Sequence, residues 1–155
     1  MNHIIVEDKL RDTNPVPVVI AFTPNYFIPA STCLYSIFAS LDIEEQMHVI
    51  CLLSEELTDR LKQKIQLIGG ERAQYSFINL QGRLQNIYID AKYTEAASYR
   101  LLLPDLLPEY DKVMYIDCDI IVRNNLVKLY RSVDLGNHYL AAVFEAPMDF
   151  QLGHL

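Results

Sequence analysis

The sequence predicts an α/β fold in which helices flank a mostly parallel, Rossmann-like sheet. Short continuous apolar runs, such as Val16–Phe22, lack the alternation of a half-exposed strand and are typical of strands buried on both faces. Segments with apolar residues at helical spacing separate these runs. This alternation of strand and helix along the chain favours crossover connections and therefore parallel strands.

Strands and helices are expected to alternate after a polar lead-in over residues 1–15. The expected strands, in chain order, are residues 16–22, 47–53, 74–80, 113–122 and 139–144. The expected helices lie at residues 29–41, between Ser54 and Gly69, from Thr94 or Glu95 to Pro104, and at residues 125–132.

The helix boundaries depend on residues that favour helix ends. Ser54 is expected to cap the second helix because two acidic residues, suited to a helix N-terminus, follow it. Gly69 and Gly70 are expected to end that helix. Pro104 and Pro108 are expected to bound the far end of the third helix.

Length and composition limit the classes of protein. The chain of 155 residues is long enough for one domain with a substantial core. A hydrophobic content of 51% argues against a disordered chain, and a formal net charge of −7 argues against nucleic-acid binding. Cys33, Cys51 and Cys118 are too few and too scattered for a disulfide framework or a zinc site. No signal-peptide pattern or transmembrane segment is found, so a cytoplasmic location is expected. Peripheral contact with a membrane is compatible with that location.

The run from Val113 to Val122 holds two aspartates, Asp117 and Asp119, in an otherwise apolar sequence. Asp-x-Asp alone is a weak signal, because a chain of this Asp content contains about one such triplet by chance. Carboxylates in apolar surroundings need a partner or a cation, and side chains two apart on an extended segment share one face. The context therefore predicts a metal site at the carboxyl end of a strand, where open α/β sheets bind ligands. A solvated turn between two strands is the alternative.

The segment from Ala21 to Tyr26 directly follows the first expected strand. It lacks the glycines of a dinucleotide-binding or P-loop motif, which argues against both of those classes. Tyr26 offers an aromatic face that can stack on a base, and Asn25 offers an amide for a sugar hydroxyl. Packing of Tyr26 into the core is the alternative interpretation.

Arg100 lies among leucines in an apolar helical stretch, so its guanidinium needs an anionic partner or a route to solvent. A diphosphate or one of the chain's carboxylates would suit its planar fork. Extension of the side chain to the surface is the alternative. Cys118, between the two aspartates, is expected to contribute its main chain rather than a reactive thiol.

Three segments of the chain together resemble one known family: VVIAFTPNYFIPASTCLYSI, SYRLLLPDLLPEYDKVMYIDCDIIVRNNLVKLY and DLGNHYLAAV. In order and spacing they resemble the amino-terminal half of family 8 glycosyltransferases, the bacterial lipopolysaccharide galactosyl- and glucosyltransferases and their glycogenin-like relatives. The resemblance runs from about residue 16 to about residue 146. It implies a GT-A fold, a UDP-hexose donor, Mn²⁺ or Mg²⁺ as cofactor, a glycan or lipid-linked acceptor, and retention of anomeric configuration.

The resemblance also implies roles for individual residues. Asp117 and Asp119 would bind the metal that bridges the UDP diphosphate, and the main chain of Cys118 would lie near the ribose. Tyr26 would stack on uracil, and Asn25 would hold the ribose. The full donor-binding set would be Ala21, Thr23, Asn25, Tyr26, Arg100, Asp117 and Cys118.

Arg100 would contact the donor sugar or its phosphates.

The chain departs from the family at Thr23 and Pro24, where the family often has acidic residues, so altered base recognition is expected. The family's acceptor-side region and its later metal-binding histidine lie beyond Leu155. Residues 16–155 are therefore expected to form the nucleotide-sugar-binding part of a GT-A domain, truncated at its C-terminus.

Two other functional classes stay open. A nucleotide-sugar-binding or regulatory module would keep the donor site without turnover. A metal-dependent nucleotidyltransferase also combines paired aspartates, a divalent ion and phosphates. Such enzymes usually show a glycine-rich or basic nucleotide loop early in the chain, and residues 21–27 show neither.

Overall fold

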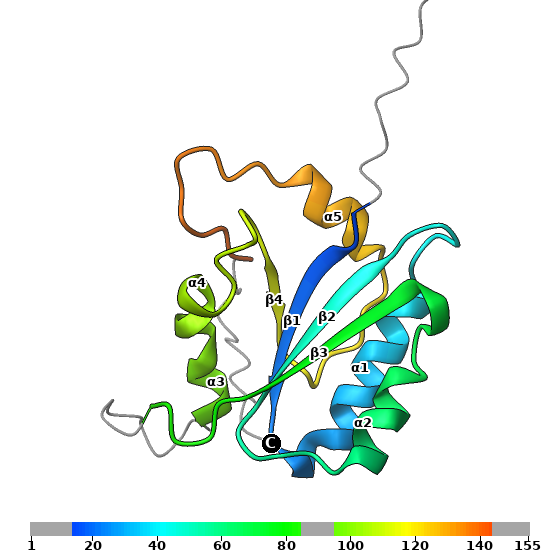
Figure 1. Ribbon diagram of the computed structural model, residues 1–155. Helices are drawn as coiled ribbons and strands as arrows, with labels where there is room; N and C mark the ends of the chain where they lie inside the picture. The colour runs from blue at the N-terminus through cyan, green and yellow to red at the C-terminus, as the bar shows by residue number, and fades with distance from the viewer. Residues whose placement is uncertain (1–13, 85–94, 144–155) are drawn as a thin grey trace, which may run out of the picture.

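The computed structural model describes residues 14–84 and 95–143, so the expected lead-in lies almost entirely outside the described residues. The described residues form one sheet of four parallel strands in the order β3-β2-β1-β4 (Figure 1). The strands are β1 (Val16–Phe22), β2 (Met47–Leu53), β3 (Ala73–Asn79) and β4 (Met114–Ile116). The helices are η1 (Pro24–Tyr26), α1 (Phe27–Ala39), α2 (Asp59–Gln66), η2 (Gly70–Arg72), α3 (Glu95–Ser98), η3 (Tyr99–Leu102), α4 (Leu103–Leu106) and α5 (Leu126–Ser132).

The two central strands occupy the residues predicted for them. β1 pairs with β2 along its full length, from Val16 opposite Met47 to Phe22 opposite Leu53. Every residue of β1 is buried, because helices cover the sheet on both faces (Figure 1). A strand buried on both faces has no solvent side that requires polar residues, which is why its sequence is continuously apolar.

Two apolar cores lie on opposite faces of the sheet. Val18 and Ile20 of β1 face the core that includes side chains of α1, α2 and α5. Val19 and Ala21 face the second core, which includes side chains of α3, η3 and α4. Alternate side chains of a strand point to opposite faces, so β1 contributes to both cores.

The start of α2 differs from the prediction that Ser54 caps it. Thr58 is the cap, with an extended backbone (φ −62°, ψ 149°) and a side-chain oxygen that accepts the Leu61 N–H at 3.4 Å. Ser54 follows β2 directly and is buried, so the chain must still cross to the helical layer before a helix can begin. Gly69 follows the end of α2 with φ = 84°, a left-handed conformation that favours glycine, as its predicted role requires.

Three further expectations are corrected. The third helix is divided into α3, η3 and α4, and Pro104 lies in the first turn of α4, where its missing N–H is tolerated. The strand expected at residues 113–122 extends only over β4. The strand expected at residues 139–144 is wrong for residues 139–143, which are irregular and exposed; Phe144 lies outside the described residues. An apolar run forms a strand only beside a partner, and this run pairs with no strand of the described sheet.

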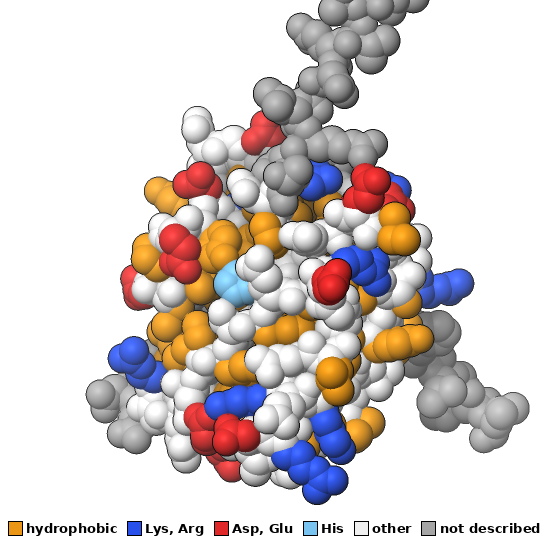
Figure 2. Space-filling model, turned by 45° about the vertical axis from the view of Figure 1, so that its right-hand side comes forward, with side chains coloured by type: hydrophobic (Ala, Val, Ile, Leu, Met, Phe, Trp, Pro, Cys, Tyr) orange, Lys and Arg blue, Asp and Glu red, His pale blue; other side chains and the backbone are white. Residues whose placement is uncertain are grey.

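The surface carries charges of both signs. On the face shown in Figure 2, acidic and basic side chains are interspersed around patches of hydrophobic side chains. Lys128 and Asp42 form one such exposed ion pair at 2.9 Å. Within the two described ranges, no helix combines the length and the apolar character needed to span a bilayer.

Candidate functional site

The order of the sheet reverses next to β1. From β1 the chain proceeds to β2 and then to β3 on one side, whereas β4 lies on the other side of β1. Open α/β sheets bind ligands beyond the carboxyl ends of their strands at such a reversal. The loops that leave β1 and β4 at this edge carry most of the predicted site residues, namely Thr23, Asn25, Tyr26, Asp117, Cys118 and Asp119.

The loop after β4, residues 117–125, presents two carboxylates to solvent. Asp117 is the first residue beyond β4, and Asp119 lies in the turn that follows. Both are exposed, whereas the Cys118 side chain between them is buried in the core that contains α1. The position at the carboxyl end of a strand is confirmed, but the expectation of an extended, buried pair is wrong. Because Cys118 is anchored inward, its two neighbours stay at the surface.

Helix α1 holds the main chain of this β4 loop. The Cys33 thiol donates to the Asp117 carbonyl at 3.8 Å, and the Val122 N–H donates to Ser36 Oγ at 2.9 Å. The Ser40 hydroxyl lies 3.2 Å from the Val122 carbonyl and 2.8 Å from the Ser36 carbonyl, so its one hydrogen is shared between them or given to Ser36. Cys33 and Ser36 of α1, and Ser40 at its C-cap, were not predicted from the sequence as part of the site. Their spacing of three and four residues, which places polar groups on one face of an apolar helix, is a signal that could have identified them.

The loop after β1 carries an exposed aromatic ring. The N–H of Tyr26 donates to the Thr23 carbonyl at 2.9 Å and closes the short helix η1. Tyr26 is 44% exposed and Asn25 is exposed, so the interpretation of Tyr26 as a core residue is wrong. Ala21 is buried against the second core, so a ligand would meet its main chain rather than its side chain.

Arg100 reaches the same edge from the other helical layer. Its Nη2 lies 3.8 Å from Oδ1 of Asp117, and its guanidinium carbon lies 4.9 Å from the centre of the Tyr115 ring. Its Nε donates to the Ala97 carbonyl at 2.7 Å. The side chains of Arg100 and Asp117 are 48% and 62% exposed. The sequence left open whether this guanidinium meets an anion or solvent, and the structure gives it both.

The two cysteines near the carboxylates, Cys33 and Cys118, are buried. Burial, and next the charge of Asp119, raises the pKa of the Cys118 thiol to about 11. Burial also raises the pKa of Cys33 to about 11, with a further contribution from Cys118. Because the thiolate is the nucleophilic form, these values argue against the reactive-thiol interpretation of Cys118.

The carboxylate oxygens of Asp117 and Asp119 are the ligand type that Mg²⁺ and Mn²⁺ prefer. Among residues 14–84 and 95–143, no group of three or more His, Cys, Asp or Glu side chains is arranged to hold a metal ion. The structure thus brings together two exposed carboxylates of the right chemical type, and a cation there would need water or ligand oxygens to complete its shell.

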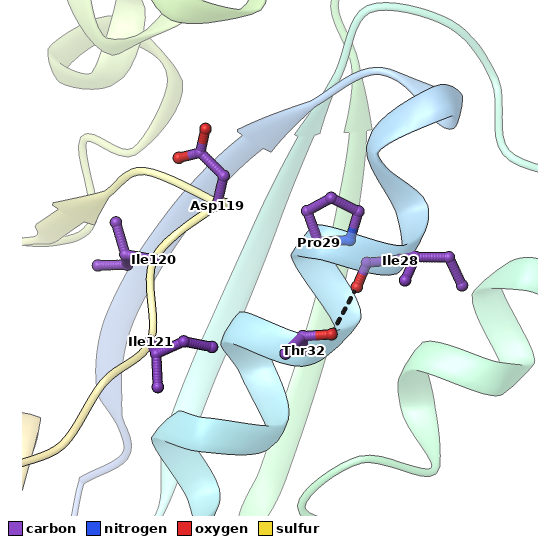
Figure 3. A pocket seen from close by; sticks show the side chains of 6 residues that line it. All are labelled: Ile28, Pro29, Thr32, Asp119, Ile120 and Ile121. Atoms are coloured by element: carbon purple, nitrogen blue, oxygen red, sulfur yellow. Dashed lines mark hydrogen bonds between the residues drawn. The ribbon is translucent and has the colours of Figure 1, made fainter.

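A mostly apolar pocket of about 280 Å³ lies beside Asp119, between α1 and the β4 loop (Figure 3). Its lining residues are Ile28, Pro29, Thr32, Asp119, Ile120 and Ile121. Ile28 and Ile121 are 68% and 61% exposed. The Thr32 hydroxyl donates to the Ile28 carbonyl at 3.0 Å, as the dashed line in Figure 3 shows. Asp119 therefore borders a pocket with mainly apolar walls, and its carboxylate points away from α1 (Figure 3).

His48 belongs to a separate polar cluster. It is the second residue of β2, near the amino end of the sheet and away from the candidate site. Its Nδ1 is hydrogen-bonded to the Tyr110 hydroxyl, and its Nε2 to Ser76 Oγ at 2.8 Å. Burial lowers the pKa of His48, while Glu109 acts in the opposite direction. With both ring nitrogens engaged, this histidine has a structural role.

Comparison with known proteins assigns the chain to a family. The model of Glycosyl transferase family 8 matches residues 17–152, which is most of the chain. The chain belongs to this family. The match covers both loops of the candidate site and confirms the resemblance that the sequence motifs indicated.

Individual glycosyltransferases are also similar to this chain. Glycosyltransferase GlyE of Streptococcus pneumoniae serotype 4 (strain ATCC BAA-334 / TIGR4) is 30% identical over 106 residues, covering 66% of this chain and 26% of GlyE. The structure of the bifunctional glycosyltransferase WbbM in its apo form has a TM-score of 0.67 and 25% identity, covering 88% of this chain and 23% of that chain.

The galactosyltransferase LgtC, solved in complex with donor and acceptor sugar analogs, has a TM-score of 0.61 and 24% identity. The match covers 78% of this chain and 44% of the LgtC chain. At that identity the likeness shows the fold, and the predicted GT-A fold is confirmed. The chain spans less than half the length of each of these three relatives.

Proposed function

We propose that the chain forms the nucleotide-sugar-binding part of a metal-dependent, retaining hexosyltransferase that takes UDP-glucose or UDP-galactose as donor. The enzyme would act in the synthesis of lipopolysaccharide or another surface glycan, with a glycan or lipid-linked acceptor. The observation that carries the proposal is the approach of Arg100 to Asp117 at the reversal point of a family 8 sheet. A cation and an anion exposed side by side there suit a ligand that brings both a metal and phosphates.

Asp117 and Asp119 would hold Mn²⁺ or Mg²⁺, each through carboxylate oxygens that solvent already reaches. When bound, the cation would act as a Lewis acid on the diphosphate and stabilise the charge that develops as the anomeric C–O bond breaks. The buried Cys118 side chain fixes the main chain between the two carboxylates, and that main chain would lie near the ribose.

Arg100 would bind the diphosphate or the donor sugar. Its guanidinium is half-exposed and directed to the edge where the carboxylates lie, so it can exchange Asp117 for a phosphate oxygen without leaving a buried charge unpaired. Stacking on the Tyr115 ring orients the planar group.

The β1 loop would bind the nucleoside. Tyr26 has an open ring face for uracil, and the exposed Asn25 has an amide for the ribose hydroxyls. Thr23 stands where an acidic residue is usual in the family, so it would meet the base through a hydroxyl rather than a carboxylate. Thr23 and Ala21 complete the proposed donor site.

Calorimetric titration of UDP tests the proposal. UDP should bind with Mn²⁺ present and should bind much more weakly with a chelator, because the cation joins the diphosphate to Asp117 and Asp119. Asp119→Ala should abolish the metal-dependent part of the affinity. The matched control is Asp111→Ala, which also removes an exposed carboxylate, from the residues that precede β4. Equal UDP affinity with metal and with chelator would refute the proposal.

Two further experiments, a comparison of ligand binding and a turnover assay, separate the alternative functional classes. Preference for a nucleoside triphosphate over a UDP-sugar would favour a nucleotidyltransferase. Incubation with UDP-glucose or UDP-galactose, Mn²⁺ and a panel of glycans, with UDP release as the readout, addresses turnover. Donor binding without acceptor-stimulated release would indicate a nucleotide-sugar-binding module.

A further inference from the structure

The β4 loop leaves the sheet before it reaches the second carboxylate. Pairing between β4 and β1 ends at Ile116, opposite Ile20. The positions of Asp117 and Asp119 therefore depend on contacts outside the strand ladder. Those contacts come from α1, a helix that precedes the loop by about eighty residues of sequence.

Ser36 makes the central contact. Its Oγ accepts the Val122 N–H at 2.9 Å and donates to the Cys33 carbonyl at 2.7 Å. The hydroxyl is therefore fixed by its own helix at the same time as it holds the loop. Val122 as a whole is only 9% exposed, so removal of Ser36 Oγ would leave this N–H in a poorly hydrated place.

Cys33 of α1 and Ser40 at its C-cap contact the loop on either side of Asp119. Cys33 donates to the carbonyl of Asp117, and the Ser40 hydroxyl lies 3.2 Å from the carbonyl of the same Val122, with the Ser36 carbonyl a closer acceptor at 2.8 Å. Asp119 lies between these two fixed points, three residues before Val122. Cys33 and Ser36 of α1 thus contact the main chain before and after the second carboxylate, at Asp117 and at Val122.

We propose that Ser36 is a positioning residue for the cation site at Asp117 and Asp119. By fixing the Val122 main chain, it holds the Asp119 carboxylate in the direction that binds the ion. This inference rests on the proposed function, since it presumes that the two carboxylates bind a cation. Groups that orient a metal ligand commonly change metal affinity by about 10–100-fold when they are removed.

The test measures the affinity of the full chain carrying Ser36→Ala for Mn²⁺ in the absence of nucleotide, with electron paramagnetic resonance as the readout of bound and free Mn²⁺. The variant should bind Mn²⁺ about tenfold more weakly per folded molecule. Ser31→Ala is the matched control, because the Ser31 hydroxyl lies on the same helix and donates within it, to the Phe27 carbonyl at 2.7 Å. Its Mn²⁺ affinity should stay within about twofold of the parent.

Asp119→Ala, measured alongside, separates the two hypotheses. If it abolishes Mn²⁺ binding while Ser36→Ala behaves like Ser31→Ala, the positioning role is wrong and the proposed function stands. If Asp119→Ala leaves Mn²⁺ binding unchanged, both are wrong. A purely structural role for Ser36 would lower the melting temperature without changing affinity per folded molecule. Should Ser36→Ala not fold, Ser36→Cys, which has a weaker acceptor, is measured in the same way with the same expected direction.

Discussion

The ion pair between Arg100 and Asp117 predicts effects of opposite sign on metal and nucleotide binding. In the unliganded protein the guanidinium neutralises part of the charge that a metal would use. Replacement by glutamine in Arg100→Gln should therefore strengthen the binding of Mn²⁺ alone. The same change removes a group proposed to bind the diphosphate, so it should weaken the binding of UDP at saturating Mn²⁺.

The size of each effect follows from the geometry. Two unit charges 3.8 Å apart attract by about 1 kcal/mol in water and about 4 kcal/mol at an effective dielectric constant near 20. Both side chains are about half exposed, so the value of about 0.2–1 kcal/mol measured for exposed pairs applies. Mn²⁺ alone should then bind about 1.5- to 5-fold more tightly. A charge-assisted hydrogen bond to phosphate is worth about 1.5–3 kcal/mol, so its loss should lower the affinity for UDP by about 10- to 150-fold.

Two titrations on the same protein preparation measure these effects, Mn²⁺ alone and UDP at saturating Mn²⁺. Arg123→Gln is the control, because it removes the same charge from an exposed position on the same β4 loop. It should shift Mn²⁺ affinity less than Arg100→Gln and leave UDP affinity nearly unchanged. Weaker binding of Mn²⁺ alone in Arg100→Gln, or equal effects of the two substitutions, would refute the reasoning.

Three further predictions concern binding and stability. Tyr26→Ala should weaken UDP binding by about tenfold or more, since base stacking is worth about 1–3 kcal/mol. The melting temperature should stay nearly unchanged, because Tyr26 is 44% exposed. A variant that unfolds but keeps its UDP affinity per folded molecule would contradict this prediction. Gly69→Ala should destabilise the fold by about 2–5 kcal/mol, because φ is 84° and the new Cβ would lie 2.8 Å from the Phe38 ring. In a thermal unfolding experiment the melting temperature should fall by roughly 5–15 °C. Burial lowers the pKa of His48 in the folded protein, so protonation of this histidine favours the unfolded state. Its contribution to the free energy of unfolding is therefore kept above pH 6.5 and lost as the pH falls below that value. Urea unfolding across that range should therefore show a flatter pH dependence of stability for His48→Gln, and an unchanged slope would count against it.

The parts of the fold that the sequence predicted are those governed by local pattern. β1 and β2 were predicted to the residue, because burial on both faces leaves a continuous apolar run with clear ends. The run at residues 139–143 has a similar composition but no strand to pair with in the described sheet, and composition does not report pairing. Ser54 and Thr58 are both good caps, and the choice between them depends on where the chain reaches the helical layer.

For the candidate site, the sequence supplied the chemistry but not the contacts. Asp117 and Asp119 could be singled out because carboxylates are unusual in an apolar run. That Arg100 meets Asp117, and that Ser36 meets Val122, depends on how layers far apart in the sequence pack together. A hydrophobic pattern gives the face that a helix buries, not the atom that a side chain reaches.

Helix α1 begins directly after Tyr26 and, ten positions later, presents Ser36 to the β4 loop. One inserted residue between them would turn Ser36 by about 100° around the helix axis and remove it from Val122, whereas Tyr26 would keep its place. A four-residue insertion would nearly restore the direction but would move the hydroxyl along the axis by about 6 Å. The length of this stretch is therefore constrained independently of its composition, and functional variants should differ here by substitution and not by insertion or deletion.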